Sequence, residues 1–546
     1  MKSPILGSSY VARSVNAADS RMVNLFPEIV PEGGKEPAFL NRAPGLRLLA
    51  NMGDGPIRGM WQFNGHGYVV SGNVLYKVDS LFRPFPIGTV SGSPGPVSMS
   101  DNGTQLFVAC NGPSYIYNSL TLEFKQIDDP DFPGAVTVGY LNGYFVFNEP
   151  NSQRIWITQL LDGTSIDPLD FASAEGSPDG LVSLLISHRE AWLFGTNSVE
   201  VWYDSGAADF PLTPVQGSFN EIGCVASYSV AKLDNGIFWL GADARGRGIV
   251  YRASGYTATR ISTHAVEWQI QQYGTLSDAI AYTYQQDGHA FYVLIFPSAN
   301  TTWVYDVATS LWHERAAFVN GSFTRHRSNC QMSFSNEIVV GDHEVGNIYA
   351  FDLDVFSDNG DVQKWLRSWR ALPTGTNDLK RTAQHSLQLD AETGAIDASV
   401  TTPPIIVDVS APDDKLLTEA GDVIVWEGVS GSLILTESGD PIVQENGSYI
   451  DQDGAAGGAI LVQVGQIQAT GIDPQVMLRW SDDGGHTWSN DHWRSMGLTG
   501  QYGRRVIWRR LGMTLKLRDR VYEVSGTDQV KIAIMGAELI VSATNG

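Results

Sequence analysis

Pairs of acidic residues are the part of this sequence that could most directly carry out chemistry. They occur at Asp128-Asp129, Asp413-Asp414 and Asp482-Asp483. Glycoside hydrolysis needs two carboxylates separated by roughly 5 to 10 Å across a cleft, one of them with a raised pKa. Here the acids are neighbours in Pro- and Gly-rich stretches, which is typical of solvated turns. A calcium ion bound in a loop would fit them better than catalysis, but the sequence has no EF-hand pattern.

Potential metal ligands are also present, at His326, Cys330, Asp342 and His343, in a spacing that matches no closed metal site. The sequence contains no GxSxG, Walker A, GxGxxG or HExxH motif. We therefore predict that the protein is not an enzyme and binds no metal or cofactor. The cysteines form no CxxC pair and indicate no disulfide framework: Cys110, Cys224 and Cys330.

The segment from Ser481 to Trp488 has the pattern Ser-x-Asp-x-Gly-x-Thr-Trp. It resembles the Asp-box, a hairpin turn of sialidases and other β proteins, in which the aspartate caps backbone N–H groups and the tryptophan packs underneath. In those proteins the turn lies away from the active site. A sialidase would also need several boxes and an arginine cluster, so we predict a purely structural turn, formed by Ser481, Asp483, Gly485, Thr487 and Trp488.

A basic stretch, Arg504-Arg505-Val506-Ile507-Trp508-Arg509-Arg510, stands out in a chain of formal charge −23. On a strand, side chains alternate between the two faces. Alternation puts Arg505, Ile507 and Arg509 on one face, and Arg504, Val506, Trp508 and Arg510 on the other. These arginines either contact DNA or pair with an acidic surface of another subunit. We favour the subunit contact because the chain has a surplus of acid.

The composition favours strands over helices. Charged residues make up only 17% of the 546 residues, whereas glycine (57) and aromatic residues (10%) are abundant. No apolar stretch reaches the roughly 18 to 20 residues of a membrane span. The start, Met1-Lys2-Ser3-Pro4, lacks the apolar core of a secretory signal. The negative charge argues against wrapping nucleic acid as the main task.

The strands that must position these residues are predicted by a repeated sequence pattern. An Asn-Gly or similar turn precedes a short apolar run, and a second short strand that usually carries tyrosine comes after a gap. Seven markers, spaced by 38, 38, 48, 46, 53 and 47 residues, define the copies: Tyr68, Leu106, Tyr144, Trp192, Phe238, Phe291 and Ile338. Periods of this size are typical of β-propeller blades. The alternatives are a two-sheet sandwich or a string of hairpins.

We therefore predict an all-β protein with a β-propeller of six or seven blades, an additional C-terminal β region and a small β insertion. Residues 1–55 are expected to form an extended N-terminal arm, and the arm or later residues could supply a closing strand. Residues 56–355 are assigned to the propeller, and 356–401 with 459–546 to the C-terminal region. Residues 402–458 are assigned to the insertion because Leu417-Thr418-Glu419 recurs as Leu435-Thr436-Glu437, a period of 18.

Five segments resemble the packaged-DNA stabilisation proteins of short-tailed bacteriophages, and they follow the family's order along nearly the whole chain. The 402–458 region has no counterpart in that resemblance. The segments are Val23–Glu28, Arg42–Leu46, Gly176–Leu181, Leu193–Trp202 and Arg504–Gly512.

The resemblance implies a tail accessory, or nozzle, protein of the virion, made in the host cytoplasm. Several copies, six by family expectation, would form a homo-oligomeric ring below the portal and its adaptor. The ring would extend the channel for double-stranded DNA, without sequence-specific binding, and help to retain the packaged genome before ejection. A plug, needle or tailspike protein would dock on it. The alternative is a propeller-type carbohydrate-binding or glycan-processing tail protein, suggested by the Asp-box and the many tryptophans.

Overall fold

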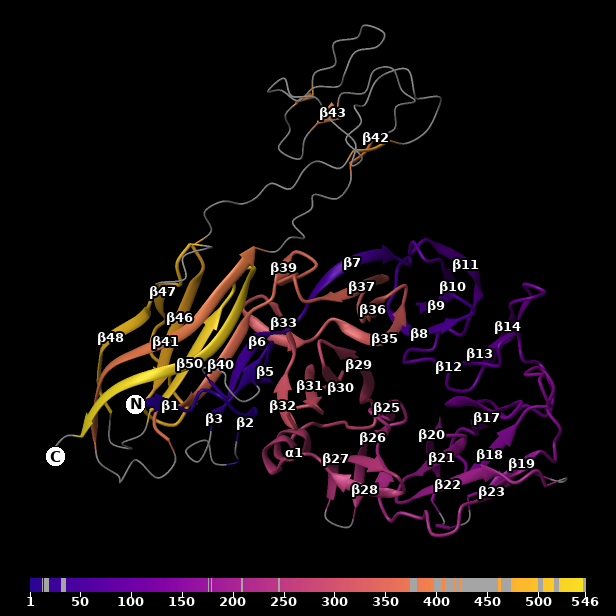
Figure 1. Ribbon diagram of the computed structural model, residues 1–546. Coiled ribbons are helices and arrows are strands. Elements are labelled where there is room, and N and C mark those ends of the chain that lie inside the picture. Colours follow the sequence, from indigo (N-terminus) through magenta and orange to yellow (C-terminus); the bar gives the residue numbers. More distant parts are fainter. Residues whose placement is uncertain are drawn as a thin grey trace, which may run out of the picture. The chain divides into compact units, whose positions relative to one another are not determined.

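The computed structural model describes residues 1–11, 13, 19–30, 36–174, 176–177, 179–207, 210–243, 246–373, 381–396, 473–498, 504–514 and 520–543, with the backbone of four short strands between residues 405 and 462. These residues fold almost entirely into β-strands, with α1 (His264–Gln271) the one helix among them (Figure 1). The predicted all-β class is confirmed. In the part of the chain so described, no helix has the length and apolar character of a membrane span.

The chain divides into two compact units, residues 1–395 with 473–546, and residues 396–472. In the second unit, β42 (Ile405–Val407) pairs with β45 (Ile460–Val462), and β43 (Leu416–Leu417) pairs with β44 (Val423–Ile424), both antiparallel. Most of the predicted 402–458 insertion, including the second copy of its repeat, lies outside the described residues. The boundaries of that insertion stay a prediction.

Seven antiparallel sheets in the first unit form the blades of a propeller. Blade 1 holds β8 (Ile57–Phe63), β9 (His66–Ser71), β10 (Val74–Val78) and β11 (Pro84–Thr89); blade 2 holds β12 (Ser98–Asp101), β13 (Gln105–Ala109), β14 (Ser114–Asn118) and β15 (Phe124–Gln126); blade 3 holds β16 (Val138–Leu141), β17 (Tyr144–Asn148), β18 (Arg154–Ile157) and β19 (Phe171–Ser173); blade 4 holds β20 (Leu181–Ser187), β21 (Glu190–Gly195), β22 (Val199–Asp204) and β23 (Leu212–Pro214).

Blades 5 to 7 complete the set. Blade 5 holds β24 (Gly223–Cys224), β25 (Ala231–Leu233), β26 (Gly236–Asp243), β27 (Gly246–Ser254) and β28 (Thr257–Arg260); blade 6 holds β29 (Ile280–Gln286), β30 (His289–Phe296), β31 (Thr301–Asp306) and β32 (Leu311–Glu314); blade 7 holds β35 (Ser328–Phe334), β36 (Glu337–Asp342), β37 (Asn347–Asp352) and β7 (Gly45–Asn51). The hairpin of β33 (Ala316–Val319) and β34 (Ser322–Arg325) follows blade 6.

The blades close into a ring through their first strands. Each of β8, β12 and β16 contacts the first strand of the next blade, β25 contacts β29, β29 contacts β35, and β35 returns to β8 (Figure 1). Every repeat marker found in the sequence lies on the strand in second place in the sheet order of its blade, which in blade 5 is β26. The first hairpins turn through residues with positive φ, such as Asn64 (48°) with Gly65 (71°) and Asn142 (49°) with Gly143 (104°), which suits the twist of a tight hairpin.

The last blade takes its outermost strand from the N-terminal segment. Strand β7 pairs antiparallel with β37, with Leu46 opposite Phe351 and Leu48 opposite Tyr349. The N-terminal segment predicted as an arm therefore supplies a closing strand, and the ring has seven blades. At the start of β7, a Cβ on Gly45 would lie 2.4 Å from the Val355 carbonyl oxygen. Only glycine allows this close approach of two backbone segments.

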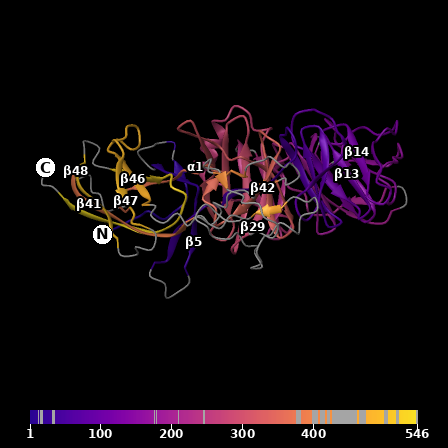
Figure 2. The ribbon, with the colours of Figure 1, turned by 90° about the horizontal axis from the view of Figure 1, so that it is seen from above.

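The C-terminal strands form a β-sandwich. One sheet has the order β48 (Val506–Met513), β41 (Thr382–Ile396), β50 (Val530–Ala543), β6 (Ala38–Arg42) and β5 (Leu25–Ile29), with β1 (Lys2–Ser3) beside β50; the other contains β40 (Trp365–Arg370), β49 (Val521–Gly526), β46 (Gln475–Ser481) and β47 (His492–Ser495). Trp365, Trp369, Trp508, Tyr522 and Leu478 form part of the shared core. Figure 2 shows β41 and β48 at one end of this unit and β13 and β14 at the other.

Strand β4 (Met22–Val23) joins the propeller to the sandwich. It pairs in parallel with β32 of blade 6 and antiparallel with β40 of the sandwich, so a nine-stranded sheet runs from β29 to β47. Two other short strand pairs are present: β2 (Tyr10–Val11) with β3 (Asp19–Ser20), and β38 (Ser357–Asp358) with β39 (Asp361–Val362), the latter beside β7. Strands β1, β4, β5 and β6 of the N-terminal segment thus belong to sheets of the sandwich, and β4 also pairs with the propeller.

Candidate functional site

The Asp-box turn directly follows β46 and is closed by its own side chains. The Asp483 carboxylate accepts hydrogen bonds from the Ser481 hydroxyl (2.6 Å), the Thr487 hydroxyl (2.6 Å) and the Thr487 N–H (2.8 Å). These bonds, with that from Ser481 the strongest, hold the pKa of Asp483 well below its usual range. The ring of Trp488 lies against Arg479, 4.7 Å from the guanidinium carbon. A carboxylate so held caps a turn and is unsuited to donating a proton in catalysis.

The neighbouring acid, Asp482, is also engaged. Its two oxygens accept from Nε and Nη2 of Arg520 at 2.7 and 2.8 Å, and Arg520 is buried (2% exposed). The guanidinium further donates to the carbonyl oxygens of Leu511 and Met513 and covers the ring of Trp480. This bidentate pair therefore ties the Asp-box turn to the end of β48.

The other candidate acids lie in turns. Asp129 accepts from the N–H groups of Asp131 (3.0 Å) and Ile166 (3.1 Å), while Asp128 is exposed. Asp413 and Asp414 lie outside the described residues. None of the acidic pairs in the described part of the chain is arranged as an acid and a base across a cleft.

The histidine, cysteine and aspartate group does not form a metal site. Asp342 accepts from Arg327 Nε (2.9 Å), the Tyr349 hydroxyl (2.8 Å) and the Glu344 N–H (2.7 Å), and His326 bonds to Ser328. Burial raises the pKa of the Cys330 thiol to about 12. Across the described ranges, no three His, Cys, Asp or Glu side chains are placed to hold a metal ion.

The basic stretch runs from Arg504 and Arg505, just before β48, into the first part of that strand, which is the terminal strand of its sheet. Val506 and Trp508 point into the sandwich core, as alternation predicts, but Arg510 does not follow them. A bulge lies opposite Gln384–Ser386, where Arg510 takes a positive φ of 62° and Leu511 turns into the core. Strict alternation was therefore wrong for Arg510, which is exposed.

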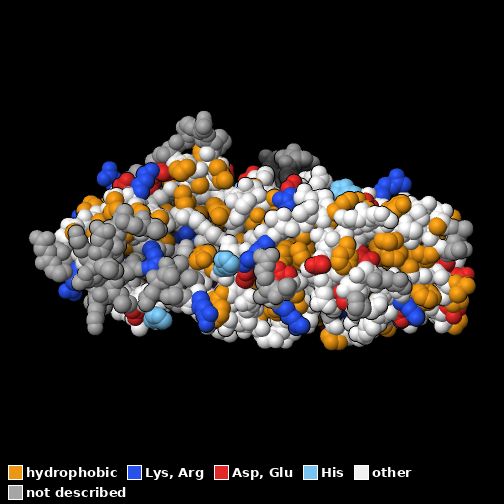
Figure 3. Space-filling model, turned by 90° about the horizontal axis from the view of Figure 1, so that it is seen from below, with side chains coloured by type: hydrophobic (Ala, Val, Ile, Leu, Met, Phe, Trp, Pro, Cys, Tyr) orange, Lys and Arg blue, Asp and Glu red, His pale blue; other side chains and the backbone are white. Residues whose placement is uncertain are grey.

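All four named arginines of this stretch have exposed side chains: Arg504, Arg505, Arg509 and Arg510. Carboxylates of the described residues form no ion pair with them. Arg494 of β47 adds a further cation by donating to the Ile507 carbonyl oxygen (3.2 Å), and Trp493 beside it is 52% exposed. The structure thus provides a basic edge strand with an exposed tryptophan nearby. On the molecular face drawn in Figure 3, by contrast, cations are scattered among acids.

Sequence reasoning missed the polar residues that hold the propeller to the sandwich. Asn24 is fully buried; its amide nitrogen donates to the carbonyl oxygens of Ala316 and Lys364, both at 2.8 Å, and its amide oxygen accepts from Ala316 N–H at 3.0 Å. Arg42 donates to the main-chain oxygens of Phe356, Gln363, Asp528 and Val530. The sequence signal that could have identified Asn24 and Arg42 is a polar residue placed inside a short apolar or Pro-containing segment.

Two segments that carry the family resemblance, Gly176–Leu181 and Leu193–Trp202, are hydrogen-bonded to each other in blade 4. Asp179 accepts from the N–H groups of Asn197 (2.6 Å) and Ser198 (3.1 Å). Glu200 accepts from Gly176 N–H (2.8 Å) and from Trp202 Nε1 (2.9 Å). The acids of these segments therefore order backbone and have no free carboxylate for chemistry.

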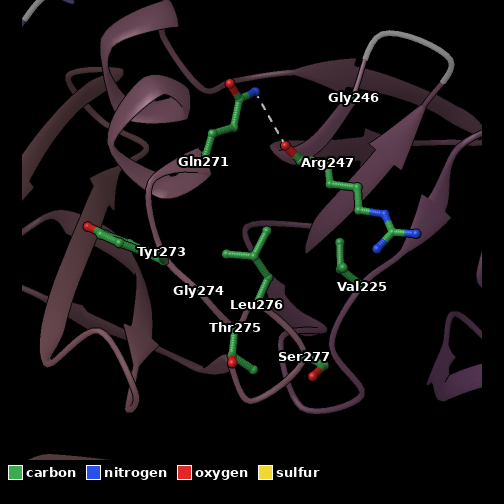
Figure 4. A pocket seen from close by; sticks show the side chains of 9 residues that line it. All are labelled: Val225, Gly246, Arg247, Gln271, Tyr273, Gly274, Thr275, Leu276 and Ser277. Atoms are coloured by element: carbon green, nitrogen blue, oxygen red, sulfur yellow. Dashed lines mark hydrogen bonds between the residues drawn. The ribbon is translucent and has the colours of Figure 1, made fainter.

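A pocket of about 560 Å³ lies beside α1 (Figure 4). Arg247, Thr275 and Ser277 supply polar groups, Val225 and Leu276 supply apolar ones, and Gln271 Nε2 donates to the Arg247 carbonyl oxygen (3.4 Å). The lining contains no carboxylate and no imidazole. Its hydroxyls thus lack a base within the lining that could activate them as nucleophiles.

Comparison with known proteins identifies two matching family models. Residues 1–356 match the model described as bacteriophage P22 Gp10, beta-propeller, and residues 451–542 match the model described as bacteriophage P22 Gp10, beta-sandwich. A search of curated protein sequences finds no match.

Solved structures resemble the chain only distantly. A streptogramin B lyase shares 11% identity at a TM-score of 0.38, with 56% of this chain and 96% of that chain covered. The N-terminal domain of Nup159 shares 10% identity at a TM-score of 0.35, with 60% and 98% covered. A chain of the mitotic checkpoint complex shares 11% identity at 0.37, with 57% and 94% covered. Similarity at this level carries no functional argument.

Proposed function

The chain belongs to the family of bacteriophage P22 Gp10, and from this premise we propose that it is the nozzle protein of a short phage tail. Copies of it form a ring, with six expected, below the portal and its adaptor. The ring extends the channel for double-stranded DNA and retains the packaged genome until ejection. A plug, needle or tailspike protein docks on it. The protein is made in the host cytoplasm and has no catalytic role.

The observation that carries this proposal is the family match over both parts of the molecule, residues 1–356 and 451–542. The fold supports the role physically. Strand β7 completes the last blade of the ring, and β4 connects the ring to the sandwich within one continuous sheet. Such a body suits a component that must hold its shape against internal pressure.

The basic edge strand supports the proposed ring. Four exposed arginines, two just before β48 and two on it, form no ion pair with the described residues, and the whole sequence carries a large surplus of acid. We propose that they meet an acidic surface of the neighbouring copy, a head-to-tail contact that can close a ring. Charges on an edge strand also discourage uncontrolled strand pairing.

The proposal is tested with purified virions of the phage that encodes the chain. Mass spectrometry should find the protein in intact particles at several copies per portal, and particles made without it should lose their DNA after packaging. Electron microscopy of labelled particles should place the protein in the tail, below the portal. Absence of the protein from intact particles would refute the proposal.

A further inference from the structure

Arg315 is a buried cation whose guanidinium forms no hydrogen bond of ordinary geometry, although it lies close enough to the Tyr284 hydroxyl to influence it. It directly follows β32 and is 2% exposed, and none of Nε, Nη1 and Nη2 has a partner in the described structure. Its guanidinium carbon lies 5.5, 5.3 and 5.6 Å from the ring centroids of Tyr284, Phe291 and Phe351. Aromatic faces stabilise a cation but accept none of the hydrogen bonds that a guanidinium donates in its plane.

Two other buried arginines of the described residues are satisfied by main-chain oxygens, which sets Arg315 apart from them. Arg42 donates to main-chain oxygens at the joint described above, and Arg367, 1% exposed, donates to the carbonyl oxygens of Ile5 (2.6 Å) and Arg21 (3.2 Å). An unpaired buried charge is strongly unfavourable. The surroundings of Arg315 must therefore offer compensation that its protein neighbours do not give.

The polar groups around Arg315 are also rich in donors. His313 and His326 are buried, and burial together with the charge of Arg315 lowers the pKa of both, to about 3 for His326. Ser328 N–H donates to Nδ1 of His326, so its ring proton lies on Nε2, which has no partner. Both ring nitrogens of His313 are unpartnered as well. A neutral imidazole brings one N–H donor and one acceptor nitrogen but no negative charge, so neither histidine compensates the guanidinium.

Acceptors near this group are few. The Tyr284 hydroxyl is a further buried polar atom here that forms no hydrogen bond of ordinary geometry. Asp306 lies close enough for its charge to act on Tyr284. Its carboxylate is already hydrogen-bonded to His289 Nδ1 (2.9 Å), the Thr309 hydroxyl (2.7 Å) and the Ala308 N–H (3.0 Å). We name the set Arg315, His313, His326 and Tyr284 the Arg315 cluster.

We propose that the Arg315 cluster binds a small inorganic anion of the halide class between blades 6 and 7. Tyr284, His313 and Arg315 belong to β29 and the end of β32 in blade 6, and His326 lies just before β35 of blade 7. Apolar residues of the two blades share one core. A halide accepts several N–H groups at once and supplies the missing charge, whereas water would satisfy the donors but leave the cation uncompensated. The bound anion stabilises the contact between two blades that the N-terminal strands also cross.

The test uses the whole protein with bromide or chloride as the anion and gluconate as a reference that is too large to enter. Crystals soaked in sodium bromide should give an anomalous peak beside the Arg315 guanidinium. In solution, chloride at about ten times its dissociation constant should raise the folding equilibrium constant about tenfold over gluconate at equal ionic strength.

Variant R315M should lose this anion dependence. The matched control is R154M, because Arg154 is an exposed arginine that also lies over an aromatic ring, Phe171 at 4.6 Å; it should keep the dependence. If R315M does not fold, the bromide peak in the unchanged protein decides alone. A cluster that holds only water, or a stability that responds equally to gluconate and chloride, would overturn the proposal.

Discussion

Single buried side chains do much of the structural work that the sequence patterns left unassigned. Asp358 is an example: it lies in β38 beside β7, is 1% exposed, and accepts one hydrogen bond, from Gln363 Nε2 at 3.2 Å. Its second oxygen has no partner. Burial raises the pKa of Asp358 to about 7, although Arg42 and Arg327 act against the shift.

This carboxyl group predicts a pH dependence of stability. Because its pKa is higher in the folded than in the unfolded state, the folded protein binds the extra proton between about pH 4 and pH 7. Stability should therefore fall as the pH rises through this window, by up to about 4 kcal/mol, and stay level above it as far as this group is concerned. Urea unfolding of D358N should show a higher stability than the unchanged protein at pH 8 and no such fall.

The exposed Asp354 of the same segment provides the control, since D354N removes one charge without touching the buried site. A D358N profile that falls as steeply as the profile of the unchanged protein would assign the pH dependence to other groups. Asp342 has the opposite shift, because hydrogen bonds from Glu344 N–H and Tyr349 outweigh its burial and lower its pKa. Its stabilisation is lost at acid pH, so the two groups act at different ends of the profile.

At the scale of elements, the sequence predicts what is local and misses what is distant. Each marker of the repeat, from Tyr68 to Ile338, lies on the strand in second place in the sheet order of its blade, because apolar runs and Asn-Gly turns are set by neighbouring residues. The bulge at Arg510 was not predictable by alternation, since it depends on packing Leu511 against the sandwich core. For the fourth strand of blade 7, the sequence predicted only that the N-terminal arm or later residues could supply a closing strand. It could not identify β7, because β7 pairs with residues about 300 positions away in the sequence.

Substituting Gly45 tests the importance of β7 for closure. An alanine Cβ would lie 2.4 and 2.5 Å from the main-chain oxygens of Val355 and Ser357, which cannot yield as a flexible side chain would. We expect G45A to lower the free energy of unfolding by about 1 to 3 kcal/mol, measured by urea denaturation.

The control is G536A, because Gly536 lies in β50 with open space around the position of a Cβ. That variant should be neutral or slightly stabilising. Equal effects of the two substitutions would show that the loss arises from strand glycines in general and not from the approach of β7 to the segment after blade 7.

Charge reversal of β48 tests the proposed contact between copies. The combined variant R504E, R505E, R509E and R510E changes side chains that are exposed in the single chain. The melting temperature should therefore change little. Sedimentation velocity should show that the variant no longer assembles into a ring.

A two-site comparison controls for net charge: R83E with R154E, at exposed arginines of blades 1 and 3, is set against R509E with R510E. Assembly of the unchanged protein should also weaken with added salt. Normal assembly of the β48 variant together with loss of packaged DNA would instead favour direct contact with DNA.

At the scale of the whole molecule, the first unit behaves as one body because its N-terminal residues belong to both parts. Strand β4 lies between β32 and β40, and β5 and β6 join the sandwich sheet before β7 enters the propeller. The sequence indicated anchors in this region but could not show their partners, since those partners lie near residues 314, 366 and 534. In the sequence, the second unit, residues 396–472, is inserted between β41 and β46 of the first unit.

Arg42 gives a direct test of this coupling. Its guanidinium donates to Phe356 and Gln363 beside blade 7 and to Asp528 and Val530 in the sandwich, so R42M leaves several buried carbonyl groups unpaired at the joint. We expect the unchanged protein to unfold its propeller and sandwich in one calorimetric transition, and R42M to separate that transition into two. The matched control is R58M, because Arg58 is also buried but donates to Gly72, Ser91 and Gly95 within the propeller. R58M should lower the transition temperature without splitting it, and a single transition in R42M would place the coupling in β4 alone.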